Sequence, residues 1–523
     1  MQGNPIVEAV FRHARERPTA PAIRDANSSL DYAGLAAALT GAVDRLAESD
    51  ARNLLLDADN GIPWAVADLA AMAVGLTVTP IPPFFTAAQI AHVATATDAD
   101  LVFASTDRAP RWWQDQQWDP AADIGGLAAF KRHGAGEGAQ AFAGKITFTS
   151  GSTGAPKGVM LSNAVLADTS AGIVEALAPL APREHISVLP LATLLENTAG
   201  LYAPLLHGSA CYLPGKAQTG LSGASLDFQA FCDLLNGSRA DTVILVPQLL
   251  TAVVALTELG MLLTPDFRLM AVGGGRVSRS LLSRAEALGL PVCEGYGLSE
   301  CGSVLTLNLP GLQRPGSVGR PLSHARLRVS ERGEIEVKEP LMAGYLDMEK
   351  RENAIAATRE DPASACWYRT GDLGHFDNDG YLYIDGRSRN VFITSYGRNV
   401  NPEWPEAALT QDASIAQALV TGEARDHNLA LLWPRGQLTQ EQVQAVVDRA
   451  NAELPDYAQV HRWIALAEPL DPALQTENGR LRRAAAMQRF APIIDQHFAG
   501  EAAAPLRRQT ATHETTRSED ALL

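Results

Sequence analysis

The chain has 523 residues, of which 46% are hydrophobic and 20% are charged, so it can bury a large core and is too long for one compact domain. Its formal net charge of -16 at pH 7, with no run rich in Lys and Arg, argues against a protein that binds a nucleic acid along its backbone. Its five cysteines form no CxxC pair and no regular spacing, which argues against a disulfide framework or a structural zinc site and favours a reducing cytoplasm.

The N-terminal part of the chain shows no signal for export. The opening MQGNPIVEAVFRHARERP lacks the basic start and long apolar stretch of a signal peptide. The most apolar segment, residues 64–80, is interrupted by Asp68, Gly75 and Pro80 and is too short to span a membrane. We therefore expect a buried helix followed by a strand there, and at most a peripheral association with membranes.

Short apolar runs recur through the first part of the chain. They lie at residues 146–148, 186–189, 243–246 and 269–272, and helix-length stretches rich in Ala and Leu separate them. Buried parallel strands have this kind of sequence. The pattern predicts an α/β fold, with a large N-terminal domain of mixed or parallel sheets covered by helices.

The character of the sequence changes at about residue 315. Short alternating strands now follow one another across polar turns, and Asn378-Asp379-Gly380 is a strong hairpin signal. We therefore expect an antiparallel β subdomain at about residues 315–386.

These features predict two domains with their boundary at residues 386–389. The N-terminal domain is expected at residues 1–386, and a small α+β C-terminal domain at residues 387–495. Residues 496–523 are polar and are expected to form a disordered tail.

A loop rich in glycine and hydroxyl groups follows the predicted strand at residues 146–148. It reads Thr149, Ser150, Gly151, Ser152, Thr153, Gly154, Ala155, Pro156, Lys157 and Gly158. Glycine lets backbone N–H groups approach anionic oxygens, hydroxyls donate further hydrogen bonds, and Lys157 adds a mobile positive charge. The residues alone leave two interpretations open, a phosphate-binding loop or a flexible surface loop; the spacing is not that of a Walker loop.

This loop, TSGSTGAPKG, closely resembles the signature loop of the adenylate-forming (AMP-binding) superfamily. That superfamily includes acyl-CoA synthetases, peptide-synthetase adenylation domains and luciferases. Further motifs follow in the expected order, so the resemblance extends from about residue 5 to residue 490. In its motifs the chain is most similar to long-chain fatty acyl-CoA synthetases.

The hexapeptide GYGLSE at residues 295–300 resembles the second motif of the superfamily. The resemblance implies that Tyr296 packs on adenine, that Ser299 meets phosphate, and that Glu300 helps to hold magnesium. Gly297 of the same motif is expected to belong to the ATP-binding site. Gly274, in the run of three glycines after residue 272, matches a position that lines the adenine and acyl pocket, although three glycines can equally form a tight turn.

Two further motifs lie close to the predicted domain boundary. Asp372, in YRTGD, is similar to the aspartate that binds the ribose hydroxyls, as a carboxylate that accepts two O–H donors would. The segment GRSRN implies that Arg387 contacts the nucleotide and that Arg389 is the hinge residue, where the family usually has Asp or Lys. Gly397 matches the glycine beside the tunnel that admits pantetheine when the small domain rotates.

The chain departs from the family at Arg480, which stands where the family has its adenylation lysine. Arginine keeps the charge but presents a wide planar group in place of a compact ammonium. Three readings stay open: Arg480 performs the role of the lysine, another basic residue such as Arg482 does, or the enzyme is slow or specialised for one half-reaction.

The resemblance implies an ATP-dependent ligase that uses magnesium. The carboxylate of an acid attacks the α-phosphate of ATP to give acyl-AMP, and a thiol then takes the acyl group. Lys157, the N–H groups of the loop and magnesium near Glu300 would serve the polyphosphate.

The acid is expected to be a medium-chain or long-chain fatty acid. With Glu196 aligned to the usual glutamate, Leu191 occupies the position that binds the ammonium of amino acids, which makes ordinary α-amino acids poor substrates. The stretch is similar to a long-chain pattern in which Thr193 replaces a histidine and Asn197 an arginine.

The acceptor is expected to be CoA, whose phosphopantetheine thiol is shared with carrier proteins. The alternatives are a ligase that loads an acyl carrier protein and, because of Arg480, a non-catalytic module that binds an acyl group or a nucleotide. His185, His207, His375 and His461 are isolated, so each is expected to be a surface or hydrogen-bonded structural residue.

Overall fold

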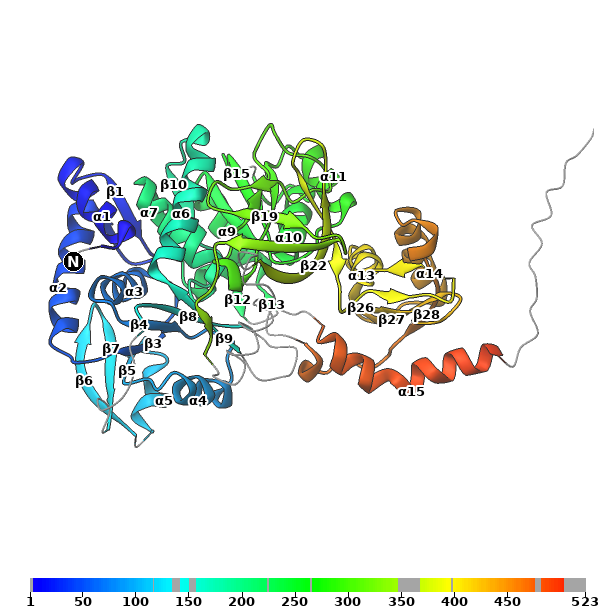
Figure 1. Ribbon diagram of the computed structural model, residues 1–523, viewed down its shortest axis with the longest axis horizontal. Coiled ribbons are helices and arrows are strands. Elements are labelled where there is room, and N and C mark those ends of the chain that lie inside the picture. The colour runs from blue at the N-terminus through cyan, green and yellow to red at the C-terminus, as the bar shows by residue number, and fades with distance from the viewer. Residues whose placement is uncertain are drawn as a thin grey trace, which may run out of the picture.

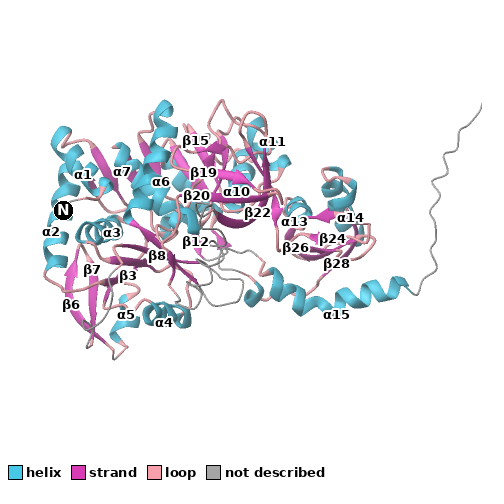
Figure 2. Cartoon of the chain, in the orientation of Figure 1, coloured by secondary structure: helices cyan, strands magenta, loops and turns pink. Residues whose placement is uncertain are grey.

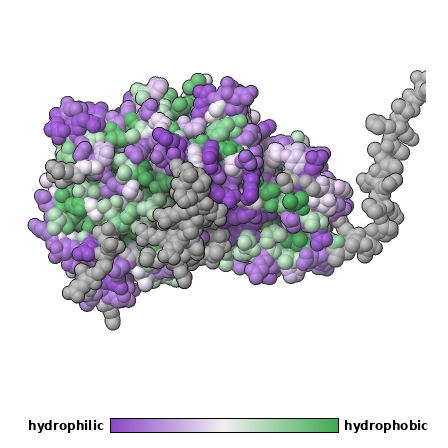
Figure 3. All heavy atoms as spheres, viewed as in Figure 1, coloured by the Kyte–Doolittle hydropathy of each residue, from purple (hydrophilic) through white to green (hydrophobic). Residues whose placement is uncertain are grey.

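The structure is a computed structural model, and Figure 1 shows its chain as a large region followed by a smaller one. It describes residues 3–115, 117–133, 142–149, 157–222, 225–263, 266–346, 367–396, 398–475 and 481–502. Figure 2 shows strands enclosed by helices in the large region, which confirms the predicted mixed α/β fold. On the face drawn in Figure 3, hydrophilic and hydrophobic residues are intermixed on both regions.

An eight-stranded sheet forms one layer of the large region, in the order β21-β9-β8-β4-β3-β5-β7-β6. The strands are β3 (Asn53–Asp57), β4 (Thr77–Pro80), β5 (Leu101–Ala104), β6 (Trp118–Ile124), β7 (Leu127–Arg132), β8 (Gly144–Thr149), β9 (Lys157–Ser162) and β21 (Gly344–Tyr345). Strand β8 contains the predicted run at residues 146–148, and it pairs parallel to β4 and antiparallel to β9.

A nine-stranded sheet forms a second layer, in the order β18-β17-β16-β15-β14-β10-β11-β1-β2. The strands are β1 (Pro21–Arg24), β2 (Ser29–Asp31), β10 (Glu184–Ile186), β11 (Ala210–Tyr212), β14 (Thr242–Leu245), β15 (Leu269–Val272), β16 (Val292–Tyr296), β17 (Thr306–Leu307) and β18 (Arg320–Pro321). Neighbouring strands run parallel to one another in the part of this sheet ordered β16-β15-β14-β10-β11-β1. The apolar runs at β10, β14 and β15 predicted this arrangement.

Helices cover both sheets and fill the space between them. Their bounds are α1 (Pro5–Glu16), α2 (Tyr32–Ala47), α3 (Ile62–Val74), α4 (Ala87–Ala96), α5 (Ala109–Trp113), α6 (Asn163–Leu177), α7 (Ala203–His207), α8 (Lys216–Thr219), α9 (Phe228–Gly237), α10 (Pro247–Glu258) and α11 (Arg279–Ala287). A π-helix, η2 (Glu196–Tyr202), precedes α7. The buried α3 followed by β4 confirms the helix and strand expected at residues 64–80.

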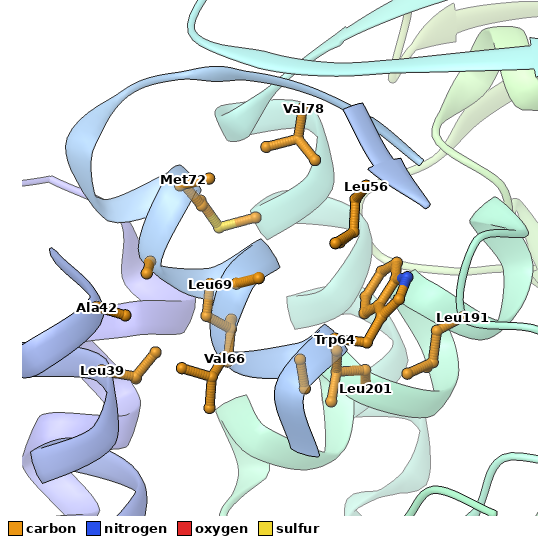
Figure 4. Packing of buried hydrophobic residues seen from close by; sticks show 14 of the residues in the cluster. Leu39, Ala42, Leu56, Trp64, Val66, Leu69, Met72, Val78, Leu191 and Leu201 are labelled. Atoms are coloured by element: carbon orange, nitrogen blue, oxygen red, sulfur yellow. The ribbon is translucent and has the colours of Figure 1, made fainter. Parts of the chain in front are cut away.

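The largest core cluster lies around α3. Figure 4 shows Trp64 of this helix beside Leu191 and Leu201, with Leu69 on the next turn. All four side chains are almost completely buried. Packing of α3 between the sheets therefore fixes the segment that carries Leu191 and η2.

A smaller antiparallel sheet follows, built from β19 (Arg326–Val329), β20 (Glu334–Glu339), β22 (Tyr368–Phe376) and β23 (Leu382–Arg387). The turn between β22 and β23 contains the hairpin signal at residues 378–380. Gly380 has a φ of 81°, which glycine adopts without strain, and the N–H of Asp377 donates to the carbonyl of Tyr381.

The C-terminal region contains a three-stranded sheet of β26 (Ile415–Thr421), β27 (Asn428–Pro434) and β28 (Val460–Ala465), with β24 (Phe392–Ile393) and β25 (Asn399–Val400) before it. Its helices are α13 (Glu403–Leu409), α14 (Gln440–Ala452) and α15 (Arg483–Ala502).

Helix α15 includes residues 496–502, so the predicted disordered tail was placed too early, because an Ala-rich sequence favours a helix. The rest of that tail lies outside the described residues. Within the described part of the chain, no helix is both long and apolar enough to cross a membrane.

Candidate active site

A cavity of about 2680 Å³ opens at the carboxyl ends of β14, β15 and β16 and is also lined by the C-terminal region. Ligands of open parallel sheets bind at this end of the strands, because the loops that follow the strands meet there. The run of three glycines follows β15, and the GYGLSE motif begins within β16. The topology therefore brings two of the predicted motifs to one edge.

Ten of the residues predicted from the motifs line this cavity. They are Thr149, Lys157, Gly274, Tyr296, Gly297, Ser299, Glu300, Asp372, Arg387 and Arg389. The others lie outside the described residues: Ser150, Gly151, Ser152, Thr153, Gly154, Gly397 and Arg480. Segments that are far apart in the sequence thus meet around one space.

Asp372 is the centre of a buried polar group. The hydroxyl of Tyr296 donates to its Oδ2 over 2.8 Å, and Nε of Arg387 lies 3.0 Å from its Oδ1. Burial raises the pKa of Asp372, and Arg387 opposes this shift. Two carboxylate oxygens offer about four acceptor positions, so Asp372 can still accept ribose hydroxyls.

Glu300 lies beside two tyrosines to which the motifs assigned no role. The hydroxyl of Tyr345 donates to Oε1 of Glu300 over 3.0 Å and lies 3.4 Å from the hydroxyl of Tyr368. Burial, followed by the charge of Glu300, raises the pKa of Tyr345 to about 12, which keeps it a donor at neutral pH. Tyr345 pairs with Val159 on β9, and no short motif marks it in the sequence.

The surroundings of Glu300 fit magnesium. A carboxylate oxygen is a hard donor, and protein-bound magnesium takes one or two carboxylates together with phosphate oxygens of the substrate. Among the described residues, no group of three or more His, Cys, Asp and Glu side chains could hold a metal ion. Glu300 would therefore hold the ion together with the nucleotide and not within a protein cage.

Lys157 is placed by the pairing of two strands. It is the first residue of β9 and lies opposite Thr149, the last residue of β8. The two strands thus bring both ends of the predicted phosphate loop together at the cavity. The loop between them, residues 150–156, lies outside the described residues.

A second cluster joins the large and small regions at the cavity wall. The guanidinium carbon of Arg276 lies 5.1 Å from the ring centre of Trp404, which is a cation–π arrangement. Burial raises the pKa of the adjacent Glu294 to about 8, and Arg276 opposes this shift. The sequence marks these two residues only by their place next to motifs. Arg276 follows the three glycines, and Glu294 precedes GYG.

The segment next to Arg480 reaches the same cavity. Arg482 lines it, and its Nε donates to the carbonyl of Gln475 over 2.9 Å. The neighbouring Arg483 also lines the cavity, but its guanidinium is held by Glu406 and by the carbonyl of Val420. Arg482 is therefore the described cation of this segment that can face a ligand.

Part of the wall of this cavity is mostly apolar, and we call this part the apolar passage. It is lined by Ile173, Val174, Leu177, His185, Leu195, Ala199, Ala203, Thr242, Ile244, Leu269, Ala271, Val304 and Leu307. Thr242 and Ile244 on β14 lie opposite Leu269 and Ala271 on β15, so these four side chains share one face of the sheet.

The apolar passage is lined in part by β14 and β15, each of which is about 13 Å long at 3.3 Å per residue. Leu195, Ala199 and Ala271 border the two core clusters on either side of it. Its described side chains are apolar apart from His185 and Thr242. His185 is hydrogen-bonded to Glu196 at 2.9 Å and to Thr242 at 3.0 Å, as expected for a structural histidine.

The interpretation of Leu191 was wrong. This side chain is fully buried in the core beside Trp64 and is not among the residues that line the cavity. Its backbone N–H is held by the side chain of Asn60 over 2.7 Å, which turns the segment toward the core. Thr193, two residues later, does line the cavity.

Comparison with known proteins identifies the family. The family model described as AMP-binding enzyme matches residues 10–346, and that described as AMP-binding enzyme C-terminal domain matches residues 389–502. A 2-succinylbenzoate–CoA ligase of Bacillus licheniformis is 30% identical over 295 residues, which is 54% of this chain and 57% of that protein. The corresponding ligase of Geobacillus kaustophilus is 33% identical over 298 residues, 53% of this chain and 55% of that protein.

The matched segment thus spans little more than half the length of these relatives. Two solved structures share the fold. The o-succinylbenzoate CoA synthetase of Bacillus subtilis with its acyl-adenylate has a TM-score of 0.72 at 21% identity, covering 91% of this chain and 97% of that one. An anthranilate CoA ligase with anthranoyl-AMP has a TM-score of 0.73 at 17% identity, covering 92% and 96%. Because the first family model covers more than half of the sequence, the chain belongs to the AMP-binding enzyme family.

Proposed function

We propose that this protein is an acid–CoA ligase that activates a carboxylic acid with ATP and passes the acyl group to the thiol of CoA. One observation carries the proposal. Ten residues from the AMP-binding motifs line one cavity that continues into the apolar passage. The cavity therefore offers polar groups for a nucleotide next to apolar walls for an acid.

In the first half-reaction a carboxylate oxygen of the acid forms a bond to the α-phosphorus of ATP. The bond between that phosphorus and the bridging oxygen breaks, and pyrophosphate leaves. Tyr296, Asp372 and Arg387 would hold the nucleoside, and Lys157 would offset charge on the phosphates. Magnesium, held by Glu300, would supply further neutralisation of that charge.

In the second half-reaction the thiol sulfur attacks the acyl carbon. The thiol loses its proton, the bond from the acyl carbon to the phosphate oxygen breaks, and AMP leaves. No protein nucleophile is needed in either step. The proposed hinge at Arg389 and the thiol tunnel at Gly397 would serve this step.

The apolar passage supports an acid with an extended apolar body, such as a medium-chain or long-chain fatty acid. Its walls offer burial worth roughly 25 cal/mol per Å² of apolar surface. The relatives described above are not fatty acyl-CoA synthetases, so this choice rests on the apolar lining of the passage.

An aromatic acid is the second candidate, because the matched relatives are named for 2-succinylbenzoate. A succinylbenzoate carries a second carboxylate. The described side chains of the apolar passage include no Lys or Arg to pair with it, and an unpaired buried carboxylate is costly. This argument favours acids with a single carboxylate.

The test is pyrophosphate release with ATP and magnesium across acetate, octanoate, palmitate, benzoate and 2-succinylbenzoate, with and without CoA. Hydroxylamine would trap any acyl-AMP. We expect release to be greatest with octanoate or palmitate and turnover to require CoA. Trapped adenylate without CoA turnover would indicate an acceptor other than CoA, such as a carrier protein. A lack of pyrophosphate release with every acid tested would support a non-catalytic module.

A further inference from the structure

Lys145 is a fully buried lysine that the proposed chemistry does not use. It is the second residue of β8, the strand that leads to Thr149. Its Nζ lies 2.6 Å from Oδ1 of Asp68 and 2.6 Å from Oδ1 of Asn197. Lysine is almost never fully buried unless it is paired, so this contact defines the position of the side chain.

Asp68 joins three elements at this point. It lies on α3 and accepts hydrogen bonds from Lys145 on β8 and from two residues of the π-helix η2. The hydroxyl of Tyr202 donates to Oδ2 of Asp68 over 2.6 Å, and Nδ2 of Asn197 donates to the same oxygen over 3.3 Å. We call these four residues the Lys145 cluster.

The Lys145 cluster pairs a lysine with a carboxylate inside the core. Burial lowers the pKa of Lys145, and the charge and hydrogen bond of Asp68 oppose this shift. The rings of Trp64 and Tyr202 lie 5.5 Å and 5.2 Å from the ammonium and add cation–π attraction. Removal of one charged group alone would leave the other buried without a partner, which is strongly destabilising.

The cluster lies between two walls of the proposed site. Alternation along β8 places Lys145 on the same face as Thr149, about 13 Å further along the strand. On η2, Asn197 bonds to Lys145 while Ala199 lines the apolar passage. π-helices are rare and recur at functional sites, because the extra residue in the turn redirects side chains.

We propose that the Lys145 cluster is a positioning device, which holds η2 against β8 and thereby sets the width of the apolar passage. The inference rests on the proposed function, because the passage is taken to hold the acid. The long-chain pattern has an arginine at the position of Asn197. In this chain the basic group at that place is the ammonium of Lys145 on β8, which donates to Asn197. The cluster contacts neither substrate, so its effect is on acid selectivity.

Two changes test this inference. The double variant Lys145→Met with Asp68→Asn removes both charges and keeps similar volumes, so neither charge is left unpaired. Tyr202→Phe removes one hydrogen bond from Asp68. Tyr32→Phe is its matched control, because Tyr32 is also fully buried in the same core and donates one hydrogen bond, to the carbonyl of Ser209 over 2.9 Å.

The first measurement is hydrogen–deuterium exchange of the peptide that covers residues 196–202. We expect faster exchange in the double variant and in Tyr202→Phe than in Tyr32→Phe. Equal exchange in all three variants would show that the Lys145 cluster does not hold η2. This measurement needs no turnover, so it decides the point even if no acid is activated and the proposed function fails.

The second measurement is the ratio of kcat/KM for palmitate to kcat/KM for acetate. We expect the cluster variants to change this ratio by about 3- to 30-fold and Tyr32→Phe to leave it unchanged. A merely structural role would lower the melting temperature of every variant and keep the ratio. Faster exchange with an unchanged ratio would therefore overturn the inference.

Discussion

The hydroxyl of Tyr296 donates a 2.8 Å hydrogen bond to Oδ2 of Asp372, a residue 76 positions later in the chain. Tyr296 ends β16 of the nine-stranded sheet, and Asp372 lies on β22 of the smaller antiparallel sheet. The bond therefore connects two layers at the cavity. It also ties together two motifs that the sequence presents separately.

This relationship predicts the effect of Asp372→Asn. A hydrogen bond to a charged group contributes about 1.5 to 3 kcal/mol, so we expect kcat/KM for ATP to fall by about 10- to 100-fold. Steady-state kinetics at saturating acid would measure the change. Tyr381→Phe is the control, because its hydroxyl bonds the carbonyl of Leu312 away from the cavity lining. An unchanged KM for ATP in Asp372→Asn would contradict the nucleotide role.

Glu294 predicts a pH-dependent stability. Burial raises its pKa from the ordinary 4.5 to about 8, so between these values the folded protein keeps a proton that the unfolded chain has released. Stability from this group therefore falls as pH rises through this window. We expect the melting temperature of the native protein, relative to Glu294→Gln, to decrease between pH 5 and pH 8. Parallel curves for the two proteins would show that Glu294 does not titrate there.

The apolar passage predicts a length-dependent effect of Ala199→Phe. The larger side chain would fill the passage, so we expect kcat/KM for palmitate to fall by at least about tenfold and that for acetate to change little. Ala199→Ser, which adds only a hydroxyl, is the size control. If Ala199→Phe uses palmitate as well as the native protein does, the acid lies elsewhere.

The position of Arg482 at the cavity leads to a prediction of which half-reaction depends on the small domain. We expect Arg482→Ala to slow hydroxylamine-trapped adenylate formation by about 10- to 100-fold and to spare thioester formation from supplied acyl-AMP. Arg489→Ala is the control, because this exposed arginine lies on α15, the helix that begins directly after Arg482, and does not line the cavity. If Arg480→Lys speeds pyrophosphate release and Arg482→Ala has no effect, Arg480 is the adenylation residue instead.

The sequence by itself determined the α/β fold and identified ten of the residues that line the cavity. Tyr296, Glu300 and Asp372 belong to short segments in which one strand end or turn carries several polar groups, and local sequence is sufficient to define such segments. The buried strands were predictable for the same reason, since apolar runs such as that of β14 need no distant partner to be recognised.

Only the tertiary structure decided the contacts between distant segments. Leu191 was assigned to a substrate position, but the packing around Trp64 turns it into the core. Lys145 meets Asp68 across 77 residues, and Tyr345 reaches Glu300 through the pairing of β21 with β9. Such contacts depend on strand register and helix packing, where a shift of one residue reverses the face of a side chain. The motifs therefore indicate the chemistry of this site, while the fold determines which neighbouring side chains position the motif residues.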